Sequence, residues 1–256
     1  MRAIIAFTKK EITEQMRTGK VLFLGILFIL FGIMNPAVAK LTPWLMEMMA
    51  DSLAESGMII TQVSVTALDS WMQFYKNIPI ALIAFVLLEA GIFTKEYRSG
   101  TLVLSLTKGL KRRDVVLSKS LTLILLWTVS YWLYFGVTYA YTVYYWDNSV
   151  VSYLMPSVVL WWVFGLWILS LMVFFSTLCS SNTGVLVGTG GVAFGFYLLS
   201  IIPKVAKYLP TLLADGNSLI YGQKEPGEYL TALIVTAVTG LALFGVSFPL
   251  FNKKQL

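Results

Sequence analysis

Residues 77–94 read NIPIALIAFVLLEAGIFT, and residues 95–102, which follow directly, read KEYRSGTL. The first stretch is an apolar run long enough to cross a hydrocarbon core of about 30 Å as a helix. The second stretch opens a connection that is rich in Lys and Arg. The junction therefore predicts a membrane-spanning helix that ends at a basic, water-facing loop.

Comparable apolar runs occur before and after this junction. Of the 256 residues, 57% are hydrophobic and 12% are charged, which leaves too few polar residues to cover a soluble domain of this size. We expect an all-α integral membrane protein, with residues 1–256 forming a single transmembrane domain. The expected spans lie at about residues 21–39, 77–94, 117–146, 152–178, 184–203 and 229–250.

Basic residues gather in the connections on one side of these spans. That side holds most of the 19 Lys and Arg residues, whereas the other side holds most of the acidic residues. Because positive charge is retained on the cytoplasmic side, we expect a multi-pass membrane protein with both termini in the cytoplasm. The basic residues assigned to that side are Arg2, Lys9, Lys10, Arg17, Lys20, Lys95, Arg98, Lys108, Lys111, Arg112, Arg113, Lys119, Lys253 and Lys254.

Two segments outside the spans have an amphipathic pattern. In residues 1–19, Ile5, Ile12 and Met16 share one helical face, which predicts a helix lying in the inner membrane interface. The alternative is a charged flank that only sets topology. In residues 203–227, apolar residues surround Pro210, which predicts a short helical hairpin on the outer side, between the fifth and sixth spans.

Several kinds of chemistry are absent from the chain. It has no His, which excludes an HExxH zinc site and an imidazole base. Its one cysteine, Cys179, has no accompanying base and is interpreted as a packing residue. No GxxxxGK[ST] loop is present to bind ATP. We expect no catalytic residue, no metal site, no cofactor on this chain and no nucleic-acid partner.

Some residues within the spans have two interpretations. Glu89 either has a structural or solvated role near the end of its span or lines a cavity, because a charge at this depth is costly. The aromatic residues Tyr131, Phe135 and Trp161 either line a substrate pathway or fill helix interfaces. Small residues at four-residue spacing either form a dimer interface or pack within one subunit. The glycines concerned are Gly184, Gly188, Gly191 and Gly195.

With this layout, the segment Glu96-Tyr-Arg-Ser-Gly-Thr-Leu102 resembles that of ABC-2 type transporter permeases. The resemblance covers the whole chain in layout and about 25 residues in motif. Similar variants serve bacterial exporters of bacitracin, lantibiotics and phenol-soluble modulins, so the resemblance implies a bacterial plasma membrane. It implies a cytoplasmic coupling helix between the second and third spans. Gly109 occupies a position at which members of this family frequently have a Pro. The family's motif positions fall here on Glu96, Gly100, Thr101, Leu102, Leu104, Leu106, Lys108, Arg112 or Arg113, and Lys119.

What the resemblance implies is an ATP-driven exporter of a peptide or hydrophobic small molecule. ATP and Mg would sit on a separate ATP-binding subunit, and a second permease, identical or related, would complete the pathway within membrane lipid. The alternatives are a non-transporting anchor or regulatory subunit of a sensor complex, and a proton- or ion-coupled carrier that depends on Glu89. The residues implied in coupling are Lys95, Glu96, Arg98, Gly100, Thr101, Leu102, Leu104, Lys108 and Arg112.

Overall fold

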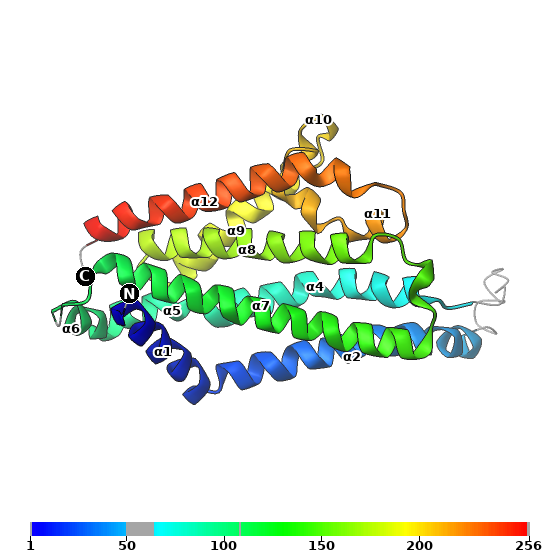
Figure 1. The fold of residues 1–256 in the computed structure, drawn as a ribbon, viewed down its shortest axis with the longest axis horizontal. Helices are drawn as coiled ribbons and strands as arrows, with labels where there is room; N and C mark the ends of the chain where they lie inside the picture. The colour runs from blue at the N-terminus through cyan, green and yellow to red at the C-terminus, as the bar shows by residue number, and fades with distance from the viewer. Residues whose placement is uncertain (1, 50–63, 108, 255–256) are drawn as a thin grey trace.

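The computed structural model describes residues 2–49, 64–107 and 109–254, which form helices and contain no strand. Six helical segments in this part of the chain are long and apolar enough to cross a membrane. Figure 1 shows the long helices side by side along the longest axis. The prediction of an all-α protein with six spans is confirmed. The segments are α2 (Lys20–Met48), α4 with α5 (Ala67–Glu89 and Gly91–Ser99), α7 (Arg112–Tyr145), α8 (Leu154–Leu178), α9 (Asn182–Leu199) and η3 with α12 (Pro226–Tyr229 and Leu230–Lys253).

The second span begins earlier than expected. The predicted edge is residue 77, but α4 begins at Ala67, where Thr66 and Asp69 form a capping box. Trp71 and Phe74 in the added turns are both fully buried. Hydropathy alone misses these turns, because their aromatic side chains are stabilised by packing against other helices rather than by a long apolar run.

The shared core of α2, α4 and α7 is aromatic. The ring of Phe74 stacks on Tyr134 with centroids 4.5 Å apart, and Phe85 meets Trp127 edge-to-face at 5.5 Å. Such pairs contribute about 0.5–1.5 kcal/mol beyond the area they bury. Phe28 of α2 joins this core, because its ring meets Trp127 edge-to-face at 6.2 Å. Aromatic packing therefore holds the first three spans together.

A polar network crosses the same three helices. The Asn35 amide donates to Thr138 Oγ1 at 2.9 Å, and Asn77 donates to Asn35 Oδ1 at 2.9 Å. Pro36 has no amide hydrogen, so the carbonyl of Gly32 lacks its helical donor. Thr138 Oγ1 donates to that carbonyl at 3.1 Å. The network thus satisfies groups that would be costly to leave unpaired in lipid.

Short helices join α9 to α12 in the segment for which a helical hairpin was predicted. They are α10 (Pro203–Ala206), η2 (Pro210–Ala214) and α11 (Gly216–Ile220). Asp215 holds the segment together, because its carboxylate accepts from the Ser218 hydroxyl at 2.7 Å and from Lys224 Nζ at 2.8 Å. A further short helix, η1 (Asn148–Val150), connects α7 to α8. On which side of the membrane these short helices lie stays a prediction.

Acid is expected to loosen this connection. Burial acts to raise the pKa of Asp215, but hydrogen bonds from Lys224 and Ser218 outweigh it and hold the pKa below its usual range. The stabilisation by this carboxylate is therefore present above about pH 4 and is lost as the pH falls through the lowered pKa. Amide hydrogen exchange in α11, relative to α7, should accelerate on acidification. The Asp215→Asn variant should exchange faster at neutral pH and lose this pH dependence; an unchanged profile would contradict the assignment.

Candidate functional site at the basic end

The candidate site lies at one end of the bundle, which we call the basic end. It contains α1 (Arg2–Arg17), α5, α6 (Thr101–Thr107) and the start of α7. Figure 1 places α6 at the extreme of this end and away from α11. The segment predicted as a coupling helix is therefore two short helices, α5 and α6, rather than one.

The bend between α5 and α6 is made by Gly100, whose φ of 68° is left-handed. Glycine adopts this conformation at little cost because it has no Cβ. On α6, Leu102 is buried and packs toward the bundle, whereas Val103 is 41% exposed. Thr101 is exposed, and its hydroxyl lies 2.8 Å from that of Ser99. Leu104 belongs to α6, but its side chain lies outside the described residues, as does Lys108.

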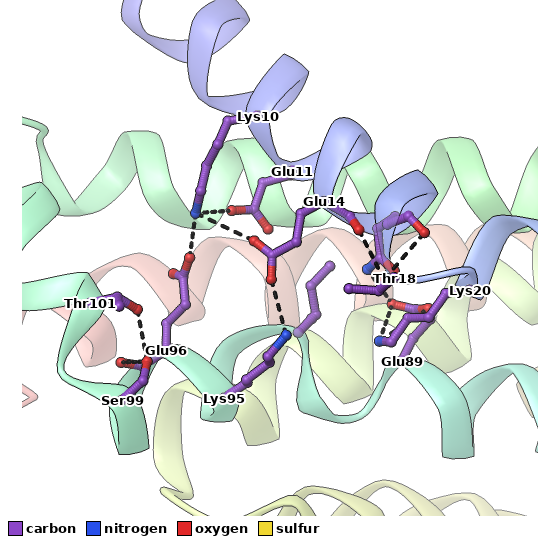
Figure 2. Close-up of polar contacts among 12 residues, drawn as sticks. Lys10, Glu11, Glu14, Thr18, Lys20, Glu89, Lys95, Glu96, Ser99 and Thr101 are labelled. Atoms are coloured by element: carbon purple, nitrogen blue, oxygen red, sulfur yellow. Dashed lines mark hydrogen bonds and ion pairs between the residues drawn. The ribbon is translucent and has the colours of Figure 1, made fainter.

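An ion cluster fixes α5 to its neighbours. It consists of Lys10, Glu11 and Glu14 of α1, Lys95 and Glu96 of α5, and Lys119 of α7; Figure 2 shows the contacts made by Lys10 and Glu14. Lys10 Nζ lies 2.6 Å from Glu96 Oε1, and Lys95 Nζ lies 3.2 Å from Glu14 Oε1. The cluster thus connects three helices that are far apart in sequence.

Lys119 is the buried cation of this cluster, with only 1% of its side chain exposed. Its Nζ lies 2.8 Å from Glu11 Oε2 and 3.1 Å from Glu96 Oε2, and donates to the carbonyl of Ile92 at 2.8 Å. A charge removed from water is costly unless it is paired in this way. Lys119, Glu11 and Glu96 are therefore stable in their charged forms only as a group, because each neutralises charge on the others.

The helix α1 turns its polar face inward. Glu11 and Gln15 are buried, whereas on the predicted apolar face Ile5 is 67% and Met16 is 64% exposed and Ile12 is half-buried. An apolar face directed away from the protein suits a helix that lies in a membrane interface. Burial acts to raise the pKa of Glu14, but the Lys95 hydrogen bond and nearby lysine charges outweigh it and hold the pKa below its usual range.

Glu89 lies beside this cluster and is fully buried. It accepts a hydrogen bond from Gln15 Nε2 at 2.7 Å and lies 3.4 Å from Lys20 Nζ (Figure 2). Because both partners come from the start of the chain, Glu89 holds α4 against α1 and α2. This geometry favours the structural interpretation, and a pathway role for Glu89 stays a prediction.

Three carboxylates of the cluster have the spacing of a metal site. Oxygen atoms of Glu11, Glu14 and Glu96 lie within 4.8 Å of one another. However, lysine ammonium groups lie 2.6–3.2 Å from these same carboxylates. The positive charge that a metal ion would supply is therefore already provided by the protein.

Glu96 is one of the residues implied in coupling. Its side chain is only 8% exposed and its carboxylate pairs with Lys10 and Lys119 inside the cluster, so a role in coupling stays a prediction. Arg112, also implied in coupling, donates to the carbonyl of Phe251 at 2.9 Å, which places its cation at the C-terminus of α12. By contrast, Lys95 and Arg98 are exposed.

The aromatic residues suggested for a pathway lie in packed helix interfaces. The Tyr131 hydroxyl donates to the Val158 carbonyl at 2.6 Å, and Trp161 Nε1 donates to the Ala214 carbonyl at 2.9 Å. Phe135 is also buried and packs on Trp71, with ring centroids 5.6 Å apart. The packing interpretation is therefore the one that this conformation favours.

The four glycines of α9 that were considered for a dimer interface divide into two pairs. A Cβ on Gly188 would meet the ring of Phe175 at 2.3 Å, and one on Gly184 would meet Cys179 Cβ at 3.0 Å. These two glycines therefore serve packing within the chain. A methyl group added to Gly191 or Gly195 would have nothing within 4 Å, so their side of α9 is open.

Sequence reasoning missed the cluster itself. The pattern of charges assigns Glu11, Glu14 and Lys119 to a flank or to the orientation of the spans, although Lys119 is buried. One signal was present in the sequence. Glu11 and Glu14 are acidic, although they lie in residues 1–19, a segment expected to place positive charge on the cytoplasmic side. Opposite charges near one membrane face favour pairing over a purely topological role.

Residues 5–218 match the model of the ABC-2 family transporter proteins, a range that contains the complete ion cluster, α5 and α6. A search of curated proteins gives no match.

Proposed function

The chain belongs to the ABC-2 family of transporter proteins, and we propose that it is the permease subunit of an ATP-driven exporter. Members of this family are membrane components of transporters, and in this proposal the chain works with a separate ATP-binding subunit. In this proposal the substrate is an amphipathic or hydrophobic molecule, specifically a peptide. A second permease completes the pathway, and both termini face the cytoplasm.

The observation that carries the proposal is the mechanical connection of α6. The helix packs chiefly against α5, and α5 continues from α4 after a single residue, Ala90. The ion cluster ties α5 to α1 and α7, while Tyr97 donates to the Ser176 carbonyl of α8 at 3.0 Å. A partner that moves α6 would therefore move these spans together as a rigid body.

The outer surfaces of α9 and α12 support a paired permease. In the apolar stretch of each of these two helices only 11% of the residues are buried within the chain, whereas in that of α8 56% are buried. Gly191 and Gly195 lie on the open side of α9, where a second helix could approach closely. In this proposal the substrate crosses between two such surfaces.

The coupling proposal is tested by charging the exposed side of α6. With the cognate ATP-binding subunit in proteoliposomes, Val103→Glu should reduce ATP-driven peptide export by about tenfold or more, since about 1.4 kcal/mol of lost binding has that effect. Gly100→Val should act similarly, because it forces a branched side chain into a left-handed conformation. Membrane insertion should remain normal in both variants.

The matched control is Val150→Glu. Val150 is 49% exposed and lies in η1, at the opposite end of the bundle. This variant should export normally. Normal export by Val103→Glu and Gly100→Val would refute the coupling assignment, and partner binding without any export would favour a regulatory subunit. Export that stops in Glu89→Gln and needs a proton gradient but no ATP would favour a carrier.

A further inference from the structure

A groove of about 410 Å³ lies between α7, α8 and α12. Its floor is apolar and buried, with Leu123, Leu169 and Val173 at most 2% exposed. Its rim is open, since Ile124 is 40% and Leu241 is 72% exposed. Because all three helices are membrane-spanning segments, the groove opens toward lipid.

One polar group in this groove has no partner. Ser120 is 3% exposed, and its Oγ makes no hydrogen bond within the part of the chain that the structure describes. The other hydroxyls that line the groove are paired within their own helices: Ser170 donates to Trp167 O at 2.7 Å and Thr236 to Ala232 O at 2.6 Å. An unsatisfied buried hydroxyl is destabilising, because it has lost its hydrogen bonds to water without gaining a partner. An acceptor that enters the groove would remove that cost.

A cation lies on the same face of α7. Arg113 precedes Ser120 by seven residues, two helical turns, and therefore lies about 10 Å nearer the basic end. Its side chain is 66% exposed, and its Nε lies 3.6 Å from Asp114 Oδ1. This contact is longer than a hydrogen bond, and the guanidinium is mostly exposed although the Asp114 side chain is only 11% exposed. The guanidinium can therefore also bind an anion.

We propose that this groove binds one anionic glycerophospholipid. An acyl chain occupies the apolar floor, an ester carbonyl accepts the hydrogen bond from Ser120, and the phosphate pairs with Arg113. The order of these contacts along α7 matches the order of chain, ester and phosphate in such a lipid. The leaflet concerned is the one at the basic end.

A neighbouring groove shows what distinguishes this site. It lies between α8, α9 and α12 and has a volume of about 340 Å³. Its only lining hydroxyl, on Thr239, donates to Val235 O at 2.7 Å and accepts from Trp167 Nε1 at 3.1 Å. With no unpaired polar group among its described lining residues, that groove is an ordinary lipid-facing surface.

The test uses the full chain, purified and delipidated in detergent, and titrated with palmitoyl-oleoyl phosphatidylglycerol or the matching phosphatidylcholine. Native mass spectrometry gives the affinity for each lipid. Ser120→Ala should weaken phosphatidylglycerol binding by about five- to tenfold. It should also raise the thermal midpoint of the lipid-free protein, because it removes an unpaired buried hydroxyl. Arg113→Gln should abolish the preference for phosphatidylglycerol over phosphatidylcholine.

Two further variants complete the test. Gly240→Leu places a side chain in the groove, with its Cβ at an ordinary 3.6 Å from Ser170 Oγ, and should exclude the lipid. Ser170→Ala is the control, because that hydroxyl lines the groove but is already paired, and it should bind as the parent does. Parental affinity in Ser120→Ala and Gly240→Leu would overturn the proposal. Equal affinity of the parent protein for the two lipids would also overturn it. None of these measurements requires the ATP-binding subunit.

Discussion

Replacing Lys119 with Met is expected to lower the free energy of unfolding by about 3–5 kcal/mol, the range for breaking a buried ion pair from one side. The substitution removes the ammonium that lies 2.8 Å from Glu11 and 3.1 Å from Glu96. Glu11 then remains buried with only the partly exposed Lys10 beside it. Since α1 and α7 meet at this cation, α1 should separate first.

The measurement is denaturant unfolding of the purified protein in detergent micelles. A variant that combines Lys119→Met with Glu11→Gln and Glu96→Gln should recover much of the loss, because no uncompensated buried charge remains. Lys95→Met is the control. Lys95 is 64% exposed and pairs with Glu14 at 3.2 Å, so its loss should cost less than about 1 kcal/mol. Equal effects of Lys119→Met and Lys95→Met would show that the cluster does not anchor α1.

The six spans could be predicted because hydropathy is a local property. A run such as residues 152–178 needs no knowledge of its neighbours to be identified as apolar and long enough, and α8 begins within two residues of that prediction and ends at its edge. The turn at Gly100 was also predictable, because left-handed backbone favours glycine. Neither feature depends on contacts distant in sequence.

The ion cluster could not be predicted in the same way. Lys119 and Glu11 are separated by 108 positions, and no local pattern states that their side chains meet. The positive-inside rule counts Lys119 as a water-facing charge. Lys119 does lie at the basic end with the other basic residues, but its side chain is buried. Glu96 illustrates the same limit, since its place in a motif does not show which way its side chain points.

The packing of the aromatic residues also could not be predicted from the sequence. The crowding of Trp and Tyr in residues 117–146 was compatible with a pathway or with helix interfaces. For Trp127, a small residue opposite the ring decides between them. Gly165 of α8 lies against the indole of Trp127 of α7, and this close approach is a relation between two helices rather than a property of either one.

Gly165→Ala is therefore expected to be strongly destabilising, by about 3 kcal/mol, at the upper end of typical overpacking costs. A methyl group at this position would lie 2.2 Å from Trp127 Cζ2. The indole cannot retreat easily, because it is fully buried and packs on Phe85 and Tyr131. To make room, α7 and α8 would have to separate, and this movement would disturb the packing of Trp127 in the aromatic core.

The matched control is Gly136→Ala on α7, where nothing lies within 4 Å of the added methyl group. That variant should be neutral or more stable by up to about 1 kcal/mol, because alanine is the better helix former. Combining Gly165→Ala with Trp127→Leu should restore part of the loss, giving a coupling energy of at least about 1 kcal/mol in a double-mutant cycle of thermal unfolding. Strictly additive effects would mean that this contact does not limit the approach of the two helices. The close fit of α7 to α8 would then have to depend on other contacts, such as the Tyr131 hydrogen bond to Val158.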